Sequence, residues 1–207
     1  RLVYRWRSSK AQRSLDHALH LQRLDLPTPR PLAAVEQRHG AVLLRSFYVC
    51  AWCDAAPQLR EALKRPDFPL RRTHLYQVGA LVARLHGAGV VHRDLSPGNI
   101  LISRHARGFC YPLLDLNRMR FTPPRDLAAA MANLAGLETR DRAGQLLLLA
   151  GYCATAGYQR KRALQLYGAA IARHRVRWRF KNAWRAWRKG FAGRPGPVPG
   201  RTRHRPG

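Results

Sequence analysis

The most informative stretch is HRDLSPGN at residues 92–99, followed by LDLN at residues 114–117. In the first stretch, Asp94 lies five residues before Asn99. In the second, another aspartate, Asp115, lies at the end of a separate strand-like segment. Phosphoryl transfer needs such a set, because one carboxylate orients the acceptor hydroxyl and takes its proton, while an amide and another carboxylate hold magnesium against nucleotide phosphates. These three residues are therefore the candidate catalytic groups.

Helical and strand-like segments surround this stretch. Apolar residues at helical spacing predict a helix over 14–24 with Ser14 as its N-cap. Two strand-like runs, 32–36 and 41–52, predict a hairpin with its turn at His39-Gly40. The other expected elements are helices over 58–64, 74–88, 125–137, 142–156 and 161–186 and strands over 100–102 and 111–114.

The composition indicates a folded chain with a large positive charge. Of its 207 residues 46% are hydrophobic, which excludes wholesale disorder, and 38 Lys and Arg against 11 Asp and Glu give a formal charge of +27. No apolar run approaches the roughly 18–20 residues that a membrane-spanning helix needs. The charge favours an anionic partner, although 33 of the basic residues are arginine and a coding bias toward arginine explains the excess equally well.

The cysteines and the start of the chain give two further expectations. Cys50 and Cys53 have the CxxC spacing, but no second close pair completes a zinc site, so we expect buried thiols in a reducing compartment. The chain starts at Arg1 without a methionine or a signal peptide, and we expect further sequence upstream.

The stretch from residue 92 resembles the catalytic loop H-R-D-x-x-x-x-N of protein-kinase-like enzymes. Asp94 matches the catalytic aspartate, Asn99 the metal-binding asparagine and Asp115 the aspartate of D-F-G. The resemblance therefore implies that Asn99 and Asp115 are the metal ligands. Leu116 and Asn117 depart from D-F-G, which argues against a typical eukaryotic protein kinase. The wider context resembles the bacterial lipopolysaccharide core kinases, the Kdo and heptose kinases, through the segments 26–33, 92–102 and 114–121.

The resemblance implies an α+β, protein-kinase-like fold with a partial small N-lobe at 1–53 and a helical C-lobe at 54–192. It further implies ATP- and magnesium-dependent transfer of phosphate to a sugar hydroxyl of the lipid A-linked inner core, at the cytoplasmic face of the inner membrane. The hinge that would hold the nucleotide falls near Val49, Cys50 and Trp52. Composition predicts a disordered basic tail at 193–207.

A complete enzyme of this type also has a glycine-rich loop and a strand lysine paired with a helix glutamate, and neither is found in this sequence. The first predicted helix resembles the one that would carry the glutamate, so Asp16 or His17 would take its place. Lys10 is interpreted as a solvated or phosphate-proximal residue. The chain is therefore part of a longer kinase or a degenerate member. The alternative function is a pseudokinase-like module that binds an anionic lipid or saccharide.

Basic and aromatic residues alternate in the last predicted helix, between Arg173 and Phe191. Phe180, Trp184, Trp187 and Phe191 follow i, i+4, i+7, i+11 spacing and share one face. Such a helix suits the surface of an anionic membrane. Packing of the aromatic stripe on the C-lobe and binding of nucleic acid are open alternatives. No recognised motif supports the last, so no specific nucleic acid is expected as a partner.

Overall fold

The structure is a computed structural model that describes residues 8–53, 56–106, 108–139 and 141–192, with side chains in 181–192 only at positions 183, 184 and 187. The chain divides into two units, Arg1–Ile171 and Ala172–Gly207. The tail at 193–207, expected to be disordered, lies outside the described residues.

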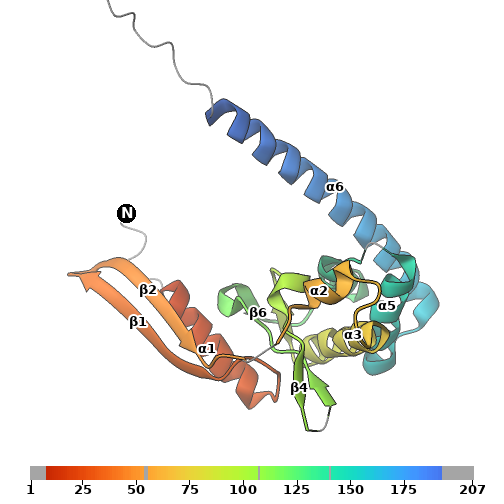
Figure 1. Ribbon diagram of the computed structural model, residues 1–207, viewed down its shortest axis with the longest axis horizontal. Helices are drawn as coiled ribbons and strands as arrows, with labels where there is room; N and C mark the ends of the chain where they lie inside the picture. Colours follow the sequence, from red (N-terminus) through yellow and green to blue (C-terminus); the bar gives the residue numbers. More distant parts are fainter. Residues whose placement is uncertain (1–7, 54–55, 107, 140, 193–207) are drawn as a thin grey trace, which may run out of the picture. The chain divides into compact units, whose positions relative to one another are not determined.

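The first part of the chain is a helix packed on a hairpin. Helix α1 (Lys10–Arg23) contacts the antiparallel pair β1 (Pro31–His39) and β2 (Val42–Cys50), and Figure 1 shows the helix lying along the hairpin. The two strands and their turn confirm the predicted hairpin. Gly40 takes a φ of +55° at the turn, a conformation that favours glycine because it has no Cβ.

The start of α1 differs from the prediction. The helix begins at Lys10, one turn before the predicted N-cap, because the Ser9 side chain accepts a hydrogen bond from the Gln12 amide at 3.0 Å. Ser14 is instead buried inside the helix, where its hydroxyl donates to the Lys10 carbonyl at 3.0 Å. The predicted cap at Ser14 is therefore wrong, although the helix itself is present.

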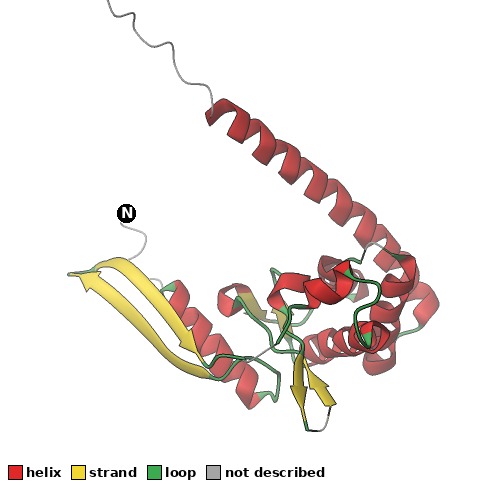
Figure 2. Ribbon diagram, viewed as in Figure 1, coloured by secondary structure: helices red, strands yellow, loops and turns green. Residues whose placement is uncertain are grey.

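Short strands frame the loops that carry Asp94 and Asp115. In the described part of the chain the strands form three two-stranded sheets (Figure 2). Beyond β1–β2, these are β3 (Val90–His92) with β6 (Met119–Phe121) and β4 (Ser103–His105) with β5 (Gly108–Cys110).

The strand predicted over 111–114 is wrong. Only Leu113 in that segment forms a bridge, with Ile100. The Pro112 nitrogen carries no hydrogen and cannot donate to a ladder, and the Leu113 amide donates to the Pro27 carbonyl at 3.0 Å. The segment is thus held on one side by the chain that follows α1 and on the other by residues 99–101, where the Leu101 amide donates to the Pro112 carbonyl at 3.0 Å.

Most of the remaining chain is helical, as predicted. The helix predicted over 142–156 is confirmed at both ends, the one predicted over 74–88 begins three residues earlier, and the one predicted over 125–137 ends in a 3₁₀ turn at Ala135–Leu137. The helices are α2 (Leu59–Lys64), α3 (Arg71–Gly87), α4 (Leu127–Leu134), α5 (Arg142–Ala156) and α6 (Arg160–Ala192). No helix within the described residues combines the length and the apolar character needed to cross a membrane.

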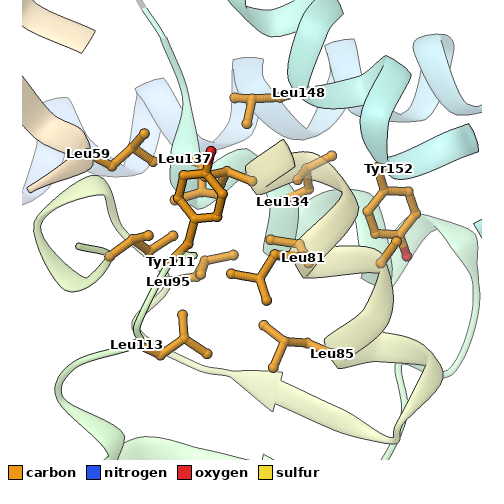
Figure 3. Packing of buried hydrophobic residues seen from close by; sticks show 14 of the residues in the cluster. Leu59, Leu81, Leu85, Leu95, Tyr111, Leu113, Leu134, Leu137, Leu148 and Tyr152 are labelled. Carbon is orange, nitrogen blue, oxygen red and sulfur yellow. The ribbon is translucent and has the colours of Figure 1, made fainter. Parts of the chain in front are cut away.

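The core lies between α3 and α5 and beneath the loops of the site (Figure 3). The two helices cross at glycines: a Cβ on Gly79 would fall on the Leu148 carbonyl, and a Cβ on Gly151 would fall on the Tyr76 carbonyl. Glycine at both positions lets the backbones approach this closely. Among the fully buried side chains are Leu75, Leu85, Ile100, Leu113, Leu134, Leu137, Leu148 and Tyr152.

Candidate active site

His92 connects the two loops that carry the candidate catalytic residues. It ends β3 and is 1% exposed. Its Nε2 donates to the Leu114 carbonyl at 2.8 Å, and its Nδ1 accepts from the Asp94 amide at 3.2 Å. Both bonds fit a neutral ring with its proton on Nε2. One buried imidazole therefore holds the backbone at Asp94 against the residue that precedes Asp115.

Asn99 makes the second connection between these loops. Its Nδ2 donates to the Asp94 carbonyl at 2.9 Å, which closes the loop on itself. Its own carbonyl accepts from the Leu114 amide at 2.9 Å. The structure thus brings Asp94, Asn99 and Asp115 together, with the backbones of Asn99 and Leu114 in direct contact.

Asp115 is exposed and has a left-handed backbone, with φ +53° and ψ +51°. Its Oδ1 accepts a short hydrogen bond from Asn117 Nδ2. The next residue along, Arg118, places its guanidinium 3.6 Å from Asp94 Oδ2. Because the two side chains of this ion pair are 65% and 50% exposed, solvent screens the attraction and both groups remain accessible to a ligand.

Helix α1 reaches this loop through a histidine. His17 Nδ1 donates to the Leu116 carbonyl at 2.7 Å, and the ring packs edge-on against Phe121 with centroids 4.9 Å apart. Asp16 is exposed and accepts from Gln12 at 2.8 Å. Of the two residues considered for the glutamate position, His17 is therefore the one that contacts the loop of Asp115.

A chain of hydrogen bonds behind the loop that carries Asp94 was not foreseen from the sequence. The Tyr152 hydroxyl lies 2.9 Å from His86 Nδ1, and His86 Nε2 lies 3.0 Å from Asn133 Oδ1. Asn133 Nδ2 then donates to the His92 carbonyl at 2.9 Å. Burial lowers the pKa of His86, although its bond to Asn133 acts in the opposite direction. Residues from α5, α3 and α4 thereby fix the backbone next to Asp94.

An apolar cavity of about 720 Å³ lies at the end of β2. Cys50 and Trp52 line it together with Leu101 and Leu114, whereas Val49 is absent from its lining. Burial raises the pKa of the Cys50 thiol, with a smaller contribution from Cys53. Leu114 directly precedes Asp115, so this cavity adjoins the candidate catalytic residues.

A second cavity, of about 890 Å³, is cationic. It lies between the first turn of α1, the start of β2 and the loops of the site. None of the described residues that line it is acidic, and five carry a positive charge: Lys10, Arg13, Arg45, Arg93 and Arg118. With no carboxylate among these residues, the cavity favours an anionic ligand.

Comparison with known proteins gives one family. The model of the lipopolysaccharide kinase (Kdo/WaaP) family matches residues 2–147. A 3-deoxy-D-manno-octulosonic acid kinase of Stenotrophomonas maltophilia is 32% identical over 118 residues, 56% of this chain and 45% of the relative. The corresponding kinase of Xylella fastidiosa is 32% identical over 93 residues, 45% of this chain and 34% of the relative. The chain thus spans less than half the length of these curated relatives.

Among solved structures, WaaP in complex with acyl carrier protein superimposes with a TM-score of 0.61 at 20% identity, over 81% of this chain and 74% of that one. The similarity confirms the α+β, protein-kinase-like fold that the sequence implied.

Proposed function

Because the chain belongs to the lipopolysaccharide kinase (Kdo/WaaP) family, we propose that it transfers the γ-phosphoryl group of ATP to a sugar hydroxyl of the lipopolysaccharide inner core, on Kdo or heptose. The observation that carries this proposal is the juxtaposition of Asp94, Asn99 and Asp115 by the hydrogen bonds of His92 and Asn99. Such a set is what phosphoryl transfer requires.

Asp94 orients the acceptor hydroxyl and takes its proton as the oxygen bonds to the γ-phosphorus. The bond from that phosphorus to the bridging oxygen breaks, and ADP leaves. Arg118, 3.6 Å from Asp94, lies where it can offset negative charge on the transferred group.

Two oxygens of the site fit a magnesium ion. Asn99 uses its Nδ2 to bond the Asp94 carbonyl, which leaves its amide oxygen for a cation, and the exposed Asp115 supplies a carboxylate. Amide and carboxylate oxygens are ligands that Mg²⁺ accepts. When bound, the ion neutralises charge on the nucleotide phosphates.

The two cavities suggest where the substrates bind. The apolar cavity at Cys50 and Trp52 suits a flat, uncharged base, because a thiol with a raised pKa stays neutral. The cationic cavity at Arg13, Arg45 and Arg93 suits the acceptor, because Kdo is an acid and carries a carboxylate.

The test is phosphate transfer from labelled ATP to Kdo-lipid A, comparing the chain with Asp94→Asn and with Asp67→Asn, an exposed carboxyl paired with Arg65. We expect Asp94→Asn to lower transfer by about 10²–10⁴-fold, because it removes the proton acceptor, while binding of Mg-ATP persists. Asp67→Asn should transfer as the parent does. Transfer that survives in Asp94→Asn would refute the assignment.

A binding module without transfer is the second candidate. His17 favours this candidate. In a complete kinase the helix carries a glutamate that pairs with a strand lysine, whereas α1 presents the imidazole of His17 to the Asp115 loop. On this alternative, the parent and Asp94→Asn both bind Kdo-lipid A, and neither transfers phosphate. Failure to bind nucleotide or saccharide would remove both candidates.

A further inference from the structure

The second half of α6 carries a stripe of exposed apolar side chains. We define the aromatic face as Val176, Phe180, Trp184 and Trp187, which follow i, i+4, i+8, i+11 spacing and so share one side of the helix. Their exposed fractions are 53%, 73%, 59% and 54%. The rings of Trp184 and Trp187 stack with centroids 5.0 Å apart. Phe191, predicted on the same face, has its side chain outside the described ones.

The other sides of this helical segment are basic. Eight Lys and Arg occupy positions 173–189, and no Asp or Glu follows Asp141 in the sequence. At 3.6 residues per turn, all of the eight except Arg173 fall beside or opposite the aromatic face. The segment is therefore an amphipathic helix with an apolar side and a cationic side.

The aromatic face does not continue the stripe that α6 buries in its first half. That stripe consists of Ala163, Tyr167, Ala170 and Ile171. Continued at the same spacing, it reaches positions 174, 178, 181 and 185, which hold His, Trp, Lys and Arg. The two stripes are about a third of a turn apart around the helix. Core packing therefore accounts for the first stripe and leaves the second to be explained.

We propose that α6, from Arg173 onward, binds the surface of an anionic lipid bilayer and lies in the plane of its headgroups. The rings of the aromatic face enter the boundary between headgroups and acyl chains, where Trp and Phe are favoured. The Arg and Lys side chains reach the lipid phosphates on either side. This segment follows the family-matched residues 2–147, and the proposal is independent of phosphate transfer.

The segregation of the side chains favours a bilayer over nucleic acid. A basic helix that binds a duplex needs cations toward the phosphates, and four exposed apolar side chains on one face would gain nothing there. A bilayer interface interacts favourably with both sides of the helix at once, because it offers apolar and anionic groups at adjacent depths.

The experiment measures co-sedimentation of the full chain with vesicles of phosphatidylcholine, with or without phosphatidylglycerol. We expect binding to the anionic vesicles that exceeds binding to the neutral ones. The double variant Trp184→Ser/Trp187→Ser should weaken that binding by about tenfold or more, because it removes both rings from the interface. Arg177→Gln/Arg179→Gln should lower binding to the anionic vesicles alone.

The matched control is Trp178→Ser. Trp178 is 61% exposed but lies nine residues from Trp187, half a turn away on the basic side, so its replacement should change binding little. All substituted residues are exposed, so the folded state should be retained, which circular dichroism checks. Equal binding to both vesicles, an equal effect of Trp178→Ser, or binding to duplex DNA with none to vesicles would overturn the proposal.

Discussion

The side chain of Asn133 holds the backbone beside Asp94 through hydrogen bonds. It donates to the His92 carbonyl and accepts from His86 Nε2. We predict that Asn133→Leu lowers kcat for phosphate transfer and leaves KM for ATP nearly unchanged, because the catalytic loop loses its support while the cavity at Cys50 is untouched. Unpaired polar groups left behind should cost about 1–3 kcal/mol in the free energy of unfolding.

Gln145→Leu is the matched control for this substitution. Gln145 also uses a side-chain amide to bond a carbonyl, that of Thr139 at 2.9 Å, but it does so at the start of α5. Steady-state kinetics and urea unfolding of both variants separate support of the loop from stability in general. An equal fall in kcat for both would mean that Asn133 acts only through stability.

Two helical glycines, one at the crossing of α3 and α5 and one in α6, differ in the space around them. A Cβ on Gly151 would fall on the Tyr76 carbonyl, whereas a Cβ on Gly168 in α6 would meet nothing within 4 Å. We predict that Gly151→Ala destabilises the chain by about 1–3 kcal/mol, since the helices must separate. Gly168→Ala should stabilise it by about 0.5–1 kcal/mol, because alanine is the better helix former.

Urea unfolding followed by circular dichroism measures both changes. The two substitutions add the same methyl group to a helix, so their opposite signs isolate the close approach at Gly151 from helix propensity. A shift of the same sign in both variants would contradict the packing that the structure shows between α3 and α5.

Elements with a regular apolar period could be predicted from the sequence, and contacts between them could not. The helix predicted over 142–156 matches α5, and the turn residues His39-Gly40 predicted the hairpin. The start of α1 was missed because Ser9 and Ser14 are equally good caps by residue type. In the site, Asp94 was placed by its local motif, whereas Asn133 bonds a residue 41 positions away. No spacing along the chain encodes such a contact.

For the molecule as a whole, two buried histidines make stability depend on pH. Burial lowers the pKa of His74 and of His86, so both resist protonation in the folded state. In the unfolded chain each titrates near the ordinary value of 6.5. Below that pH the unfolded chain therefore binds protons that the folded chain does not. We predict that the free energy of unfolding is highest above about pH 6.5 and falls on acidification, by about 1.4 kcal/mol for each unit of pKa difference.

Urea unfolding between pH 8 and pH 5 tests this dependence, with His86→Gln and His39→Gln as the variants. His86→Gln should flatten the plot of unfolding free energy against pH, because one of the two groups no longer titrates. His39→Gln, which replaces an exposed side chain beside the hairpin turn, should leave that plot unchanged. The carboxyl group of Asp141 titrates below this pH range. Burial raises the pKa of Asp141, but the Gly144 amide and Arg71 outweigh it and hold that pKa below 3.8. Its stabilising effect is therefore lost only at lower pH. If His86→Gln leaves the curve unaltered, the pH dependence of stability arises from other groups and the prediction is wrong.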